Sequence, residues 1–227
     1  MAPRVGPRLR MGAGQRRGAL VKRIRAWLAA AQKFLYKRIF RVRVLGAEHA
    51  PDGGGFLIVA NHASHLDMGL IKHALGYREL FSLAAKDYFF DTPVRRFYFS
   101  RFTNLLPFNR KARLKESLQA AGQVLTAGRP LLLFPEGTRT RDGRMLPFKP
   151  SVGYLALNNS VDVLPVYLRG TFEAMPRDTV LPRRRELAVH IGPVIRCEDL
   201  KRLAQGIPNS ESYRRVTAHI EEAVRGL

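Results

Sequence analysis

The sequence predicts an α/β fold in which a central, largely parallel sheet is flanked by helices and preceded by a basic amphipathic helix. Two observations lead to this prediction. Short apolar runs alternate with segments of helical periodicity after residue 40, and 227 residues are enough for one domain with a sizeable core. Strands that alternate with helices favour a parallel sheet, because each parallel pair needs a crossover connection.

The first 40 residues differ in composition from the rest of the chain. Residues 1–18 contain Arg, Gly and Pro with few large apolar side chains, and we expect a disordered basic tail. Residues 19–40 carry apolar side chains at helical spacing, which predicts an amphipathic helix. Its apolar face contains Leu20, Ile24, Trp27, Leu28, Ala31, Phe34, Leu35 and Ile39. Residues 41–227 are expected to form the folded domain.

The predicted N-terminal helix is basic as well as apolar. Thirteen Lys and Arg residues precede Glu48, which is the first acidic residue of the chain. A basic amphipathic helix with Trp and Phe on its apolar face is typical of a helix that lies in a membrane interface. The alternative is a helix that packs on the domain with its basic face in solvent. We favour the membrane interface; no apolar run approaches the roughly 18 residues of a membrane span.

Beyond residue 40, apolar runs bounded by turn residues predict strands, and helical spacing ended by glycine predicts helices. Strands are expected at Arg41–Leu45, Phe56–Ala60, Leu80–Ala84, Asn104–Leu106, Leu131–Phe134, Val163–Leu168 and Leu187–Ile191. Helices are expected at about Ser64–Leu75, Tyr88–Phe99, Leu114–Leu125, from Val152–Leu157 onward, and at Ser210–Val224.

The balance of charge indicates an anionic partner. Lys and Arg number 39 against 18 Asp and Glu, so the net charge of +21 suits nucleic acid, a membrane surface or a phosphorylated substrate. The basic residues are not interleaved with aromatic ones on a recognisable nucleic-acid-binding module, and we therefore expect no nucleic acid. The single cysteine, Cys197, excludes an intramolecular disulfide, and we expect a small buried side chain.

His62 and Asp67 are the candidate catalytic residues. They follow the predicted strand Phe56–Ala60, and open α/β folds gather ligand-handling groups at such strand ends. A histidine there can act as a base, and an aspartate that accepts its Nδ1–H fixes the tautomer. Five positions along a helix turn through about 140°, so we expect His62 in the loop and Asp67 in the first helical turn. A helix cap formed by Ser64 and Asp67 is a compatible alternative. With His65, the spacing matches no established metal site.

A second candidate site follows the predicted strand Leu131–Phe134. Gly137 allows a backbone N–H to approach a substrate closely, and the guanidinium of Arg139 suits bidentate binding of phosphate. Glu136 can accept a hydrogen bond from a substrate hydroxyl. The alternative is a polar turn between a strand and a helix. The substrate-binding candidates are Glu136, Gly137, Thr138, Arg139 and the nearby Lys149, for which an ordinary surface lysine is the alternative.

The order of His62-x4-Asp67 and Pro135–Arg139 resembles the glycerolipid acyltransferase family, which combines a His-x4-Asp motif with a Pro-Glu-Gly-Thr-Arg motif. The resemblance covers about residues 42–192. Leu106–Arg110 is similar to the intermediate family motif, which implies that Arg110 binds the glycerol phosphate; Asn109 stands where the family has aspartate. Val163–Val166 resembles the fourth motif, a strand that shapes the acyl-donor side.

The resemblance implies transfer of an acyl group from a thioester, on CoA or acyl carrier protein, to a lysophospholipid hydroxyl. His62 would deprotonate this hydroxyl, which attacks the thioester without a serine nucleophile, a metal or an organic cofactor. Lysophosphatidic acid is the favoured acceptor, as in 1-acylglycerol-3-phosphate acyltransferases, and another lyso-lipid is the alternative. We expect a peripheral or monotopic protein on the cytoplasmic face of an anionic membrane.

Two other classes of protein compete with this interpretation. The charge of +21 also suits a nucleic-acid-binding protein, although no recognisable module supports it. A His-dependent hydrolase would need a nucleophile, but there is no Gly-x-Ser-x-Gly elbow, and Ser64 lies too near His62 in the sequence. We therefore favour the acyltransferase.

Overall fold

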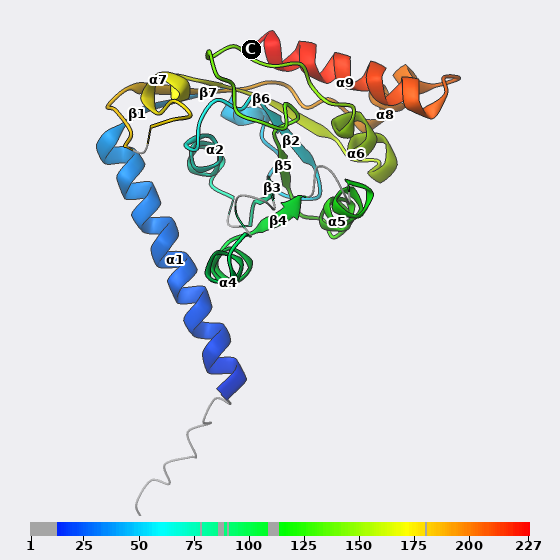
Figure 1. The fold of residues 1–227 in the computed structure, drawn as a ribbon. Coiled ribbons are helices and arrows are strands. Elements are labelled where there is room, and N and C mark those ends of the chain that lie inside the picture. The colour runs from blue at the N-terminus through cyan, green and yellow to red at the C-terminus, as the bar shows by residue number, and fades with distance from the viewer. Residues whose placement is uncertain (1–12, 78, 86–88, 90, 109–113, 180) are drawn as a thin grey trace, which may run out of the picture.

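The computed structural model describes residues 13–77, 79–85, 89, 91–108, 114–179 and 181–227. Within this part of the chain, seven strands form one sheet in the order β1-β7-β6-β2-β5-β3-β4 (Figure 1). They are β1 (Arg41–Leu45), β2 (Leu57–Ala60), β3 (Phe81–Ala85), β4 (Leu105–Phe108), β5 (Leu131–Leu133), β6 (Val163–Arg169) and β7 (Glu186–Ile191). Each lies within one or two residues of a strand expected from the sequence.

The sheet is largely parallel, as the sequence predicts. Strand β2 pairs in parallel with β5 and β6, and β3 pairs in parallel with β4 and β5. Only the β6–β7 pair among these strands is antiparallel, and β1 then runs parallel to β7. Because β2 and β5 are parallel neighbours, the segments that follow them emerge at the same edge of the sheet.

Helices cover both faces of the sheet (Figure 1). The helices described are α1 (Ala13–Ile39), α2 (Asp67–Leu75), α4 (Pro93–Phe102), α5 (Leu114–Thr126), α6 (Ser151–Asn159), α7 (Thr171–Ala174), α8 (Cys197–Ala204) and α9 (Asn209–Arg225), with a 3-10 helix at Ala47–His49. Leu57 and Val59 of β2 are buried against side chains of α5, α6, α8 and α9. Ile58 and Ala60 are buried on the opposite face, with α2 and the end of α1. A strand buried on both faces is therefore apolar at every position.

Helix α1 begins earlier than predicted, and its C-terminal end packs into the core. It begins at Ala13, so residues 13–18 are helical rather than part of a disordered tail, and residues 1–12 lie outside the described part. At its other end, Tyr36 and Phe40 are buried in the core with side chains of β2 and α2. The predicted boundary at residue 40 thus cuts through one packed cluster. None of the helices described is both long and apolar enough to span a membrane.

Helices α4, α7 and α8 depart from the expected pattern; α7, with four residues, is too short to be recognised in the sequence. The aromatic helix, expected around residues 88–99, is α4 and begins at Pro93, because the side chain of Thr92 caps it by accepting the N–H of Arg95 at 3.2 Å. Helix α8 was not predicted from the sequence. It has only eight residues, of which Cys197 and Leu200 are buried, so its apolar pattern is too short to be recognised.

Candidate active site

The loop after β2 is tied to the strands on either side of it. The buried side chain of Asn61 donates to the carbonyl of Leu168 at 3.0 Å and accepts the Leu168 N–H at 2.7 Å. The next residue, His62, accepts the N–H of Thr140 on its carbonyl at 3.0 Å. These bonds fix the loop against β6 and against the segment after β5. Sequence reasoning did not identify Asn61, whose partner is 107 residues away.

His62 and Asp67 contact each other. Nδ1 of His62 lies 2.8 Å from Oδ2 of Asp67. Asp67 lies in the first turn of α2 and is fully buried, whereas the side chain of His62 is 22% exposed. A carboxylate at Nδ1 favours the tautomer that carries its proton there, which leaves Nε2 free to accept a proton. The geometry suits a general base that an acid orients.

The same carboxylate also holds the backbone of the loop. Oδ2 of Asp67 accepts the N–H groups of Ala63 at 2.7 Å and Ser64 at 2.8 Å. This is one half of the cap that the sequence suggested. In the other half, the Ser64 hydroxyl accepts the N–H of Leu66 at 3.2 Å rather than that of Asp67, while it donates to the carbonyl of Met175 at 2.8 Å. Asp67 therefore combines the two roles that the sequence left open, since one oxygen contacts both the ring and the backbone.

Phe134 fixes the plane of the His62 ring. The two rings stack with their centroids 4.1 Å apart and their planes 14° from parallel. Phe134 directly follows β5, and the pairing of β2 with β5 brings it beside His62. Rotation of the imidazole would break this contact, so the stacking limits the ring to one orientation. From the sequence, Phe134 was expected only as a strand residue, although its place at the carboxyl end of the strand indicated that it could lie near His62.

Glu136 holds the loop that carries His62. Its side chain is buried, with Oε1 accepting the N–H of His62 at 2.6 Å and Oε2 accepting the N–H of Leu146 at 2.9 Å. The sequence suggested a bond to a substrate hydroxyl, but both oxygens already accept backbone donors. Burial raises the pKa of Glu136 to about 7, although the two backbone hydrogen bonds act in the opposite direction.

Gly137 and Lys149 lie against each other in the turn after β5. Gly137 has a φ of 72°, a left-handed conformation that favours glycine. A Cβ at this position would collide with Nζ of Lys149, so the ammonium group lies directly over the turn. The backbone N–H of Lys149 donates to the Pro135 carbonyl at 3.0 Å, which holds this segment in place. An exposed ammonium over a glycine turn is suited to contact an anion.

Arg139 lies near the histidine motif. Nη1 of Arg139 donates to the carbonyl of Arg177 at 3.4 Å. Burial lowers the pKa of His65, and the charges of Arg139 and His62 lower it further, so Arg139 acts electrostatically on this loop. Beside it, a surface hollow of about 380 Å³ is lined by Arg141, Pro176, Arg177 and Asp178. This hollow cannot be recognised in the sequence, because its walls come from segments about 35 residues apart.

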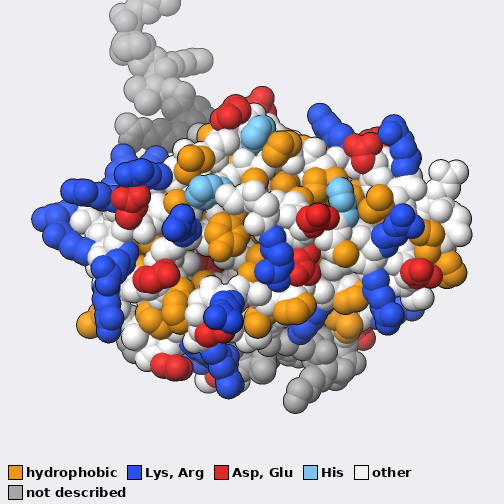
Figure 2. Space-filling model, turned by 90° about the horizontal axis from the view of Figure 1, so that it is seen from above, with side chains coloured by type: hydrophobic (Ala, Val, Ile, Leu, Met, Phe, Trp, Pro, Cys, Tyr) orange, Lys and Arg blue, Asp and Glu red, His pale blue; other side chains and the backbone are white. Residues whose placement is uncertain are grey.

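The structure thus assembles most of the predicted site residues. His62, Asp67 and Glu136 form one hydrogen-bonded group. Gly137 adjoins Lys149, and the half-buried Thr138 and Arg139 continue the same turn. Arg110 lies outside the described residues. Seen from above, the molecule shows many Lys and Arg side chains around its edge and fewer Asp and Glu, as the net charge of +21 requires (Figure 2).

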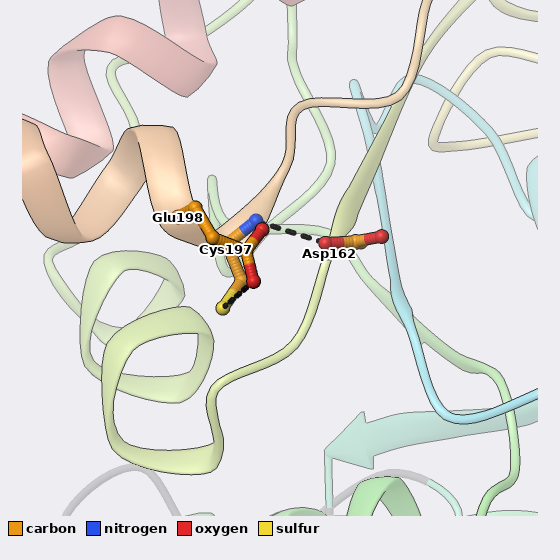
Figure 3. A group of neighbouring side chains, drawn as sticks. All are labelled: Asp162, Cys197 and Glu198. Atoms are coloured by element: carbon orange, nitrogen blue, oxygen red, sulfur yellow. Dashed lines mark hydrogen bonds between the residues drawn. The ribbon is translucent and has the colours of Figure 1, made fainter.

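Another group of polar side chains lies outside this site. Asp162, Cys197 and Glu198 carry atoms of metal-ligand type within 4.8 Å of one another (Figure 3). The two oxygens of Asp162 already accept the Cys197 N–H and a guanidinium N–H of Arg196, each at 2.8 Å. Desolvation raises the pKa of the Cys197 thiol, which disfavours the thiolate that metals bind. The arrangement holds the start of α8, and Cys197 is the buried side chain that the sequence predicts.

The fold and these motifs correspond to one family of proteins. The model of the family described as Acyltransferase matches residues 41–169, which contain strands β1 to β6, the His62–Asp67 pair and the turn through Arg139. The chain belongs to this family.

Individual relatives and one solved structure are similar to this chain. A 1-acyl-sn-glycerol-3-phosphate acyltransferase from Limnanthes douglasii is 28% identical over 159 residues, which are 70% of this chain and 56% of that protein. One from Chlamydomonas reinhardtii is 31% identical over 153 residues, or 66% of this chain and 44% of that protein. The chain spans about half the length of these curated relatives. The crystal structure of the 1-acyl-sn-glycerophosphate (LPA) acyltransferase PlsC from Thermotoga maritima matches with a TM-score of 0.69 and 26% identity, covering 96% of this chain and 82% of that chain.

Proposed function

We propose that this protein transfers a fatty acyl group from acyl-CoA or acyl carrier protein to the free hydroxyl of lysophosphatidic acid, giving phosphatidic acid. The observation that carries the proposal is the 2.8 Å contact between Nδ1 of His62 and Oδ2 of Asp67 at the sheet edge that also holds the turn through Arg139. Lysophosphatidic acid is the first choice of acceptor because the similar proteins are named for that activity.

His62 is the general base of the proposed reaction. Its Nε2 accepts the proton of the acceptor hydroxyl while the hydroxyl oxygen attacks the carbonyl carbon of the thioester. The new carbon–oxygen bond forms, the carbon–sulfur bond breaks, and the departing sulfur takes the proton back from His62. Asp67 stabilises the imidazolium between these steps and keeps the ring in the required tautomer. Phe134 and Glu136 hold the ring and the backbone of the base in place.

The acceptor phosphate is bound by the turn after β5 in this proposal. Arg139 supplies a planar guanidinium, and Lys149 supplies an ammonium group over the left-handed Gly137. Thr138, between Gly137 and Arg139, belongs to the same group. Arg110 is included through its place in the family motif, in a segment outside the described residues. The basic side chains favour an acceptor with a phosphate headgroup over one that carries no net negative charge.

The membrane surface is the proposed location of the reaction, and helix α1 is the proposed contact. Trp27 and Phe34 lie seven residues apart, on one face of the helix, and are 69% and 67% exposed. Arg23, Lys33, Lys37 and Arg38 are exposed around them. Exposed aromatic side chains surrounded by basic ones suit the headgroup region of an anionic bilayer, where apolar burial and charge attraction add.

We further propose that the protein is peripheral or monotopic and works on the cytoplasmic leaflet. Two arguments support this location. Anionic lipids give that leaflet a negative surface potential, which attracts a protein with a net charge of +21. The acyl donors named above are soluble carriers, so the active site would meet them from the aqueous side of the same surface.

A panel of acceptors tests this function. The purified protein is incubated with acyl-CoA or acyl carrier protein and with lysophosphatidic acid, lysophosphatidylcholine, lysophosphatidylethanolamine or an amino-acid-containing lyso-lipid, and products are identified by mass spectrometry. We expect phosphatidic acid to form fastest. Faster acylation of a neutral or zwitterionic acceptor would contradict the assignment of the acceptor, and no acylation of any lyso-lipid would contradict the activity.

A further inference from the structure

Tyr36 connects helix α1 to the loop that carries the catalytic pair. Its side chain is buried, and its hydroxyl donates to the carbonyl of Leu66 at 2.7 Å. Leu66 immediately precedes Asp67, and the same carbonyl accepts the N–H of Leu70 at 2.8 Å in the first turn of α2. Tyr36 therefore holds the turn from which the carboxylate of Asp67 reaches back to His62.

Close packing between α1 and α2 fixes Tyr36 in this position. The Tyr36 ring stacks on His73 of α2 with their centroids 5.7 Å apart and their planes 19° from parallel. Gly69 faces α1 so closely that a Cβ would collide with the Tyr36 hydroxyl and the side-chain amide of Gln32. Alanine is otherwise the better helix former, so the packing against α1 accounts for glycine at this position in α2.

The hydroxyl of Tyr36 remains a donor at neutral pH. Burial raises the pKa of Tyr36 well above its ordinary value, and the negative charge of Asp67 raises it further. The contribution from Asp67 also shows that the tyrosine lies within electrostatic reach of the catalytic carboxylate. The hydrogen bond to Leu66 is thus available under the conditions in which the enzyme would work.

We propose that Tyr36 is a positioning residue for the reaction, so that α1 is a structural part of the active site as well as the membrane-binding helix. This inference rests on the proposed function, because acyl transfer is its readout. Tyr36 acts through Leu66 and Asp67 and touches no substrate. Without its hydroxyl, the first turn of α2 is less constrained and Asp67 orients His62 less well. The turn that binds the acceptor phosphate is unaffected, so kcat falls and KM does not rise.

The principal test compares Tyr36→Phe with Tyr77→Phe. Both substitutions remove a hydroxyl that donates to a backbone carbonyl, that of Leu66 in one case and that of Pro51 in the other. Turnover is measured with acyl-CoA and a short-chain, water-soluble lysophosphatidic acid, so that membrane binding does not limit the rate. We expect kcat of Tyr36→Phe to fall about fivefold with both KM values unchanged, as for one lost neutral hydrogen bond. Tyr77→Phe should stay within about twofold of the parent.

A second set of variants uses the close approach at Gly69. Gly69→Ala places a methyl group against Tyr36 and Gln32, and we expect a lower kcat because the helices must move apart. Adding Tyr36→Phe and Gln32→Ala removes the two atoms that lie closest to the added methyl group, the Tyr36 hydroxyl oxygen and the Gln32 amide nitrogen. We expect this triple variant to regain turnover relative to Gly69→Ala alone, although Tyr36→Phe by itself lowers it. No recovery would contradict the inference.

The outcomes separate this inference from the proposed function. A parent protein that acylates no lyso-lipid overturns the function. An active parent whose Tyr36→Phe variant retains its kcat, or loses no more than Tyr77→Phe does, overturns only the positioning role. Thermal melting is recorded for each variant. If Tyr36→Phe has a lower kcat but the same melting temperature as Tyr77→Phe, the result supports the positioning role. If Tyr36→Phe also melts at a lower temperature, recovery of turnover in the triple variant supports the positioning role, and no recovery contradicts it.

Discussion

The loop from Asn61 to Asp67 and the outer face of α1 differ in where their side chains find partners. In the loop, His62 contacts Asp67, Phe134 and Glu136, all within the folded chain. On the outer face of α1, Trp27 and Phe34 remain exposed among basic side chains. The contacts of His62 are therefore made within the folded chain, whereas the apolar face of the helix is not buried. We conclude that chemistry and membrane binding should be separable by substitution.

Helix α1 belongs to both regions, which restricts how they can be separated. Its inner side reaches the catalytic loop through Tyr36 and the core through Phe40. Deletion of residues 1–40 would remove both side chains and expose the apolar surface of α2 and β2. Substitutions on the outer face alone are therefore the appropriate experiment for membrane binding.

The largest expected effect is on turnover when the base is removed. His62→Ala should lower kcat by about 10²–10⁴-fold, because the proposed general base is lost. The fold should persist, since the side chain is partly exposed and the bonds that Glu136 and Asp67 make to the loop backbone do not involve it. Steady-state kinetics and circular dichroism of the purified variant check both parts. Near-normal acyl transfer by a folded His62→Ala protein would remove His62 from the mechanism.

The second prediction concerns the buried brace, Glu136. Its pKa is about 7 in the folded protein and 4.5 ordinarily, so its contribution to the free energy of unfolding is complete below about pH 4.5. As the pH rises through about 7, this contribution is lost, and the free energy of unfolding falls by about 3 kcal/mol in total. Urea unfolding at a series of pH values should show this fall in the parent and a smaller one in Glu136→Gln. Parallel curves for the two proteins would mean that Glu136 titrates normally.

The third prediction separates acceptor from donor. Arg139→Ala should raise KM for lysophosphatidic acid about tenfold or more and leave KM for acyl-CoA nearly unchanged, because a charge-assisted bond to the phosphate is lost. Arg184→Ala removes an exposed arginine elsewhere and serves as the control for net charge. Equal changes in both KM values would assign Arg139 a structural role, through its bond to the Arg177 carbonyl.

The fourth prediction concerns the outer face of α1, where substitutions should affect the chemical step least and membrane binding strongly. Trp27→Ser with Phe34→Ser should reduce flotation with anionic vesicles at least about tenfold. The two substitutions remove aromatic side chains that are exposed in the free protein and would be buried in the bilayer interface. Activity toward a water-soluble acceptor should fall less than activity toward a membrane-resident one. Leu181→Ser, which removes another exposed apolar side chain, is the control. Flotation equal to that of the parent would refute the docking role of this face.

Much of the fold follows from local patterns in the sequence. The strands are short apolar runs between turns, and His62 and Asp67 are only five residues apart at the end of one of them. Their contact was therefore predictable from the geometry of a loop that enters a helix. The turn through Arg139 was recognisable for the same reason, because its residues are contiguous.

The unpredicted features depend on contacts between distant segments. Phe134 stacks on His62 only because β5 is inserted next to β2, and Glu136 braces His62 from a position 74 residues away. The apolar side chains of α1 lie in two environments in the structure. Trp27 and Phe34 are exposed, whereas Ile24 and Leu28 are half-buried. A periodic pattern gives one apolar face and contains no information on which part of it meets the domain.

The measurement that tests the central claim most directly is thiol release from acyl-CoA on anionic vesicles with and without lysophosphatidic acid. Base-catalysed transfer to a lipid hydroxyl predicts that release depends on the acceptor, equals the phosphatidic acid formed, and is lost in His62→Ala. Thiol release that is as fast without the acceptor, or that exceeds the lipid product, would identify a thioesterase and contradict the account.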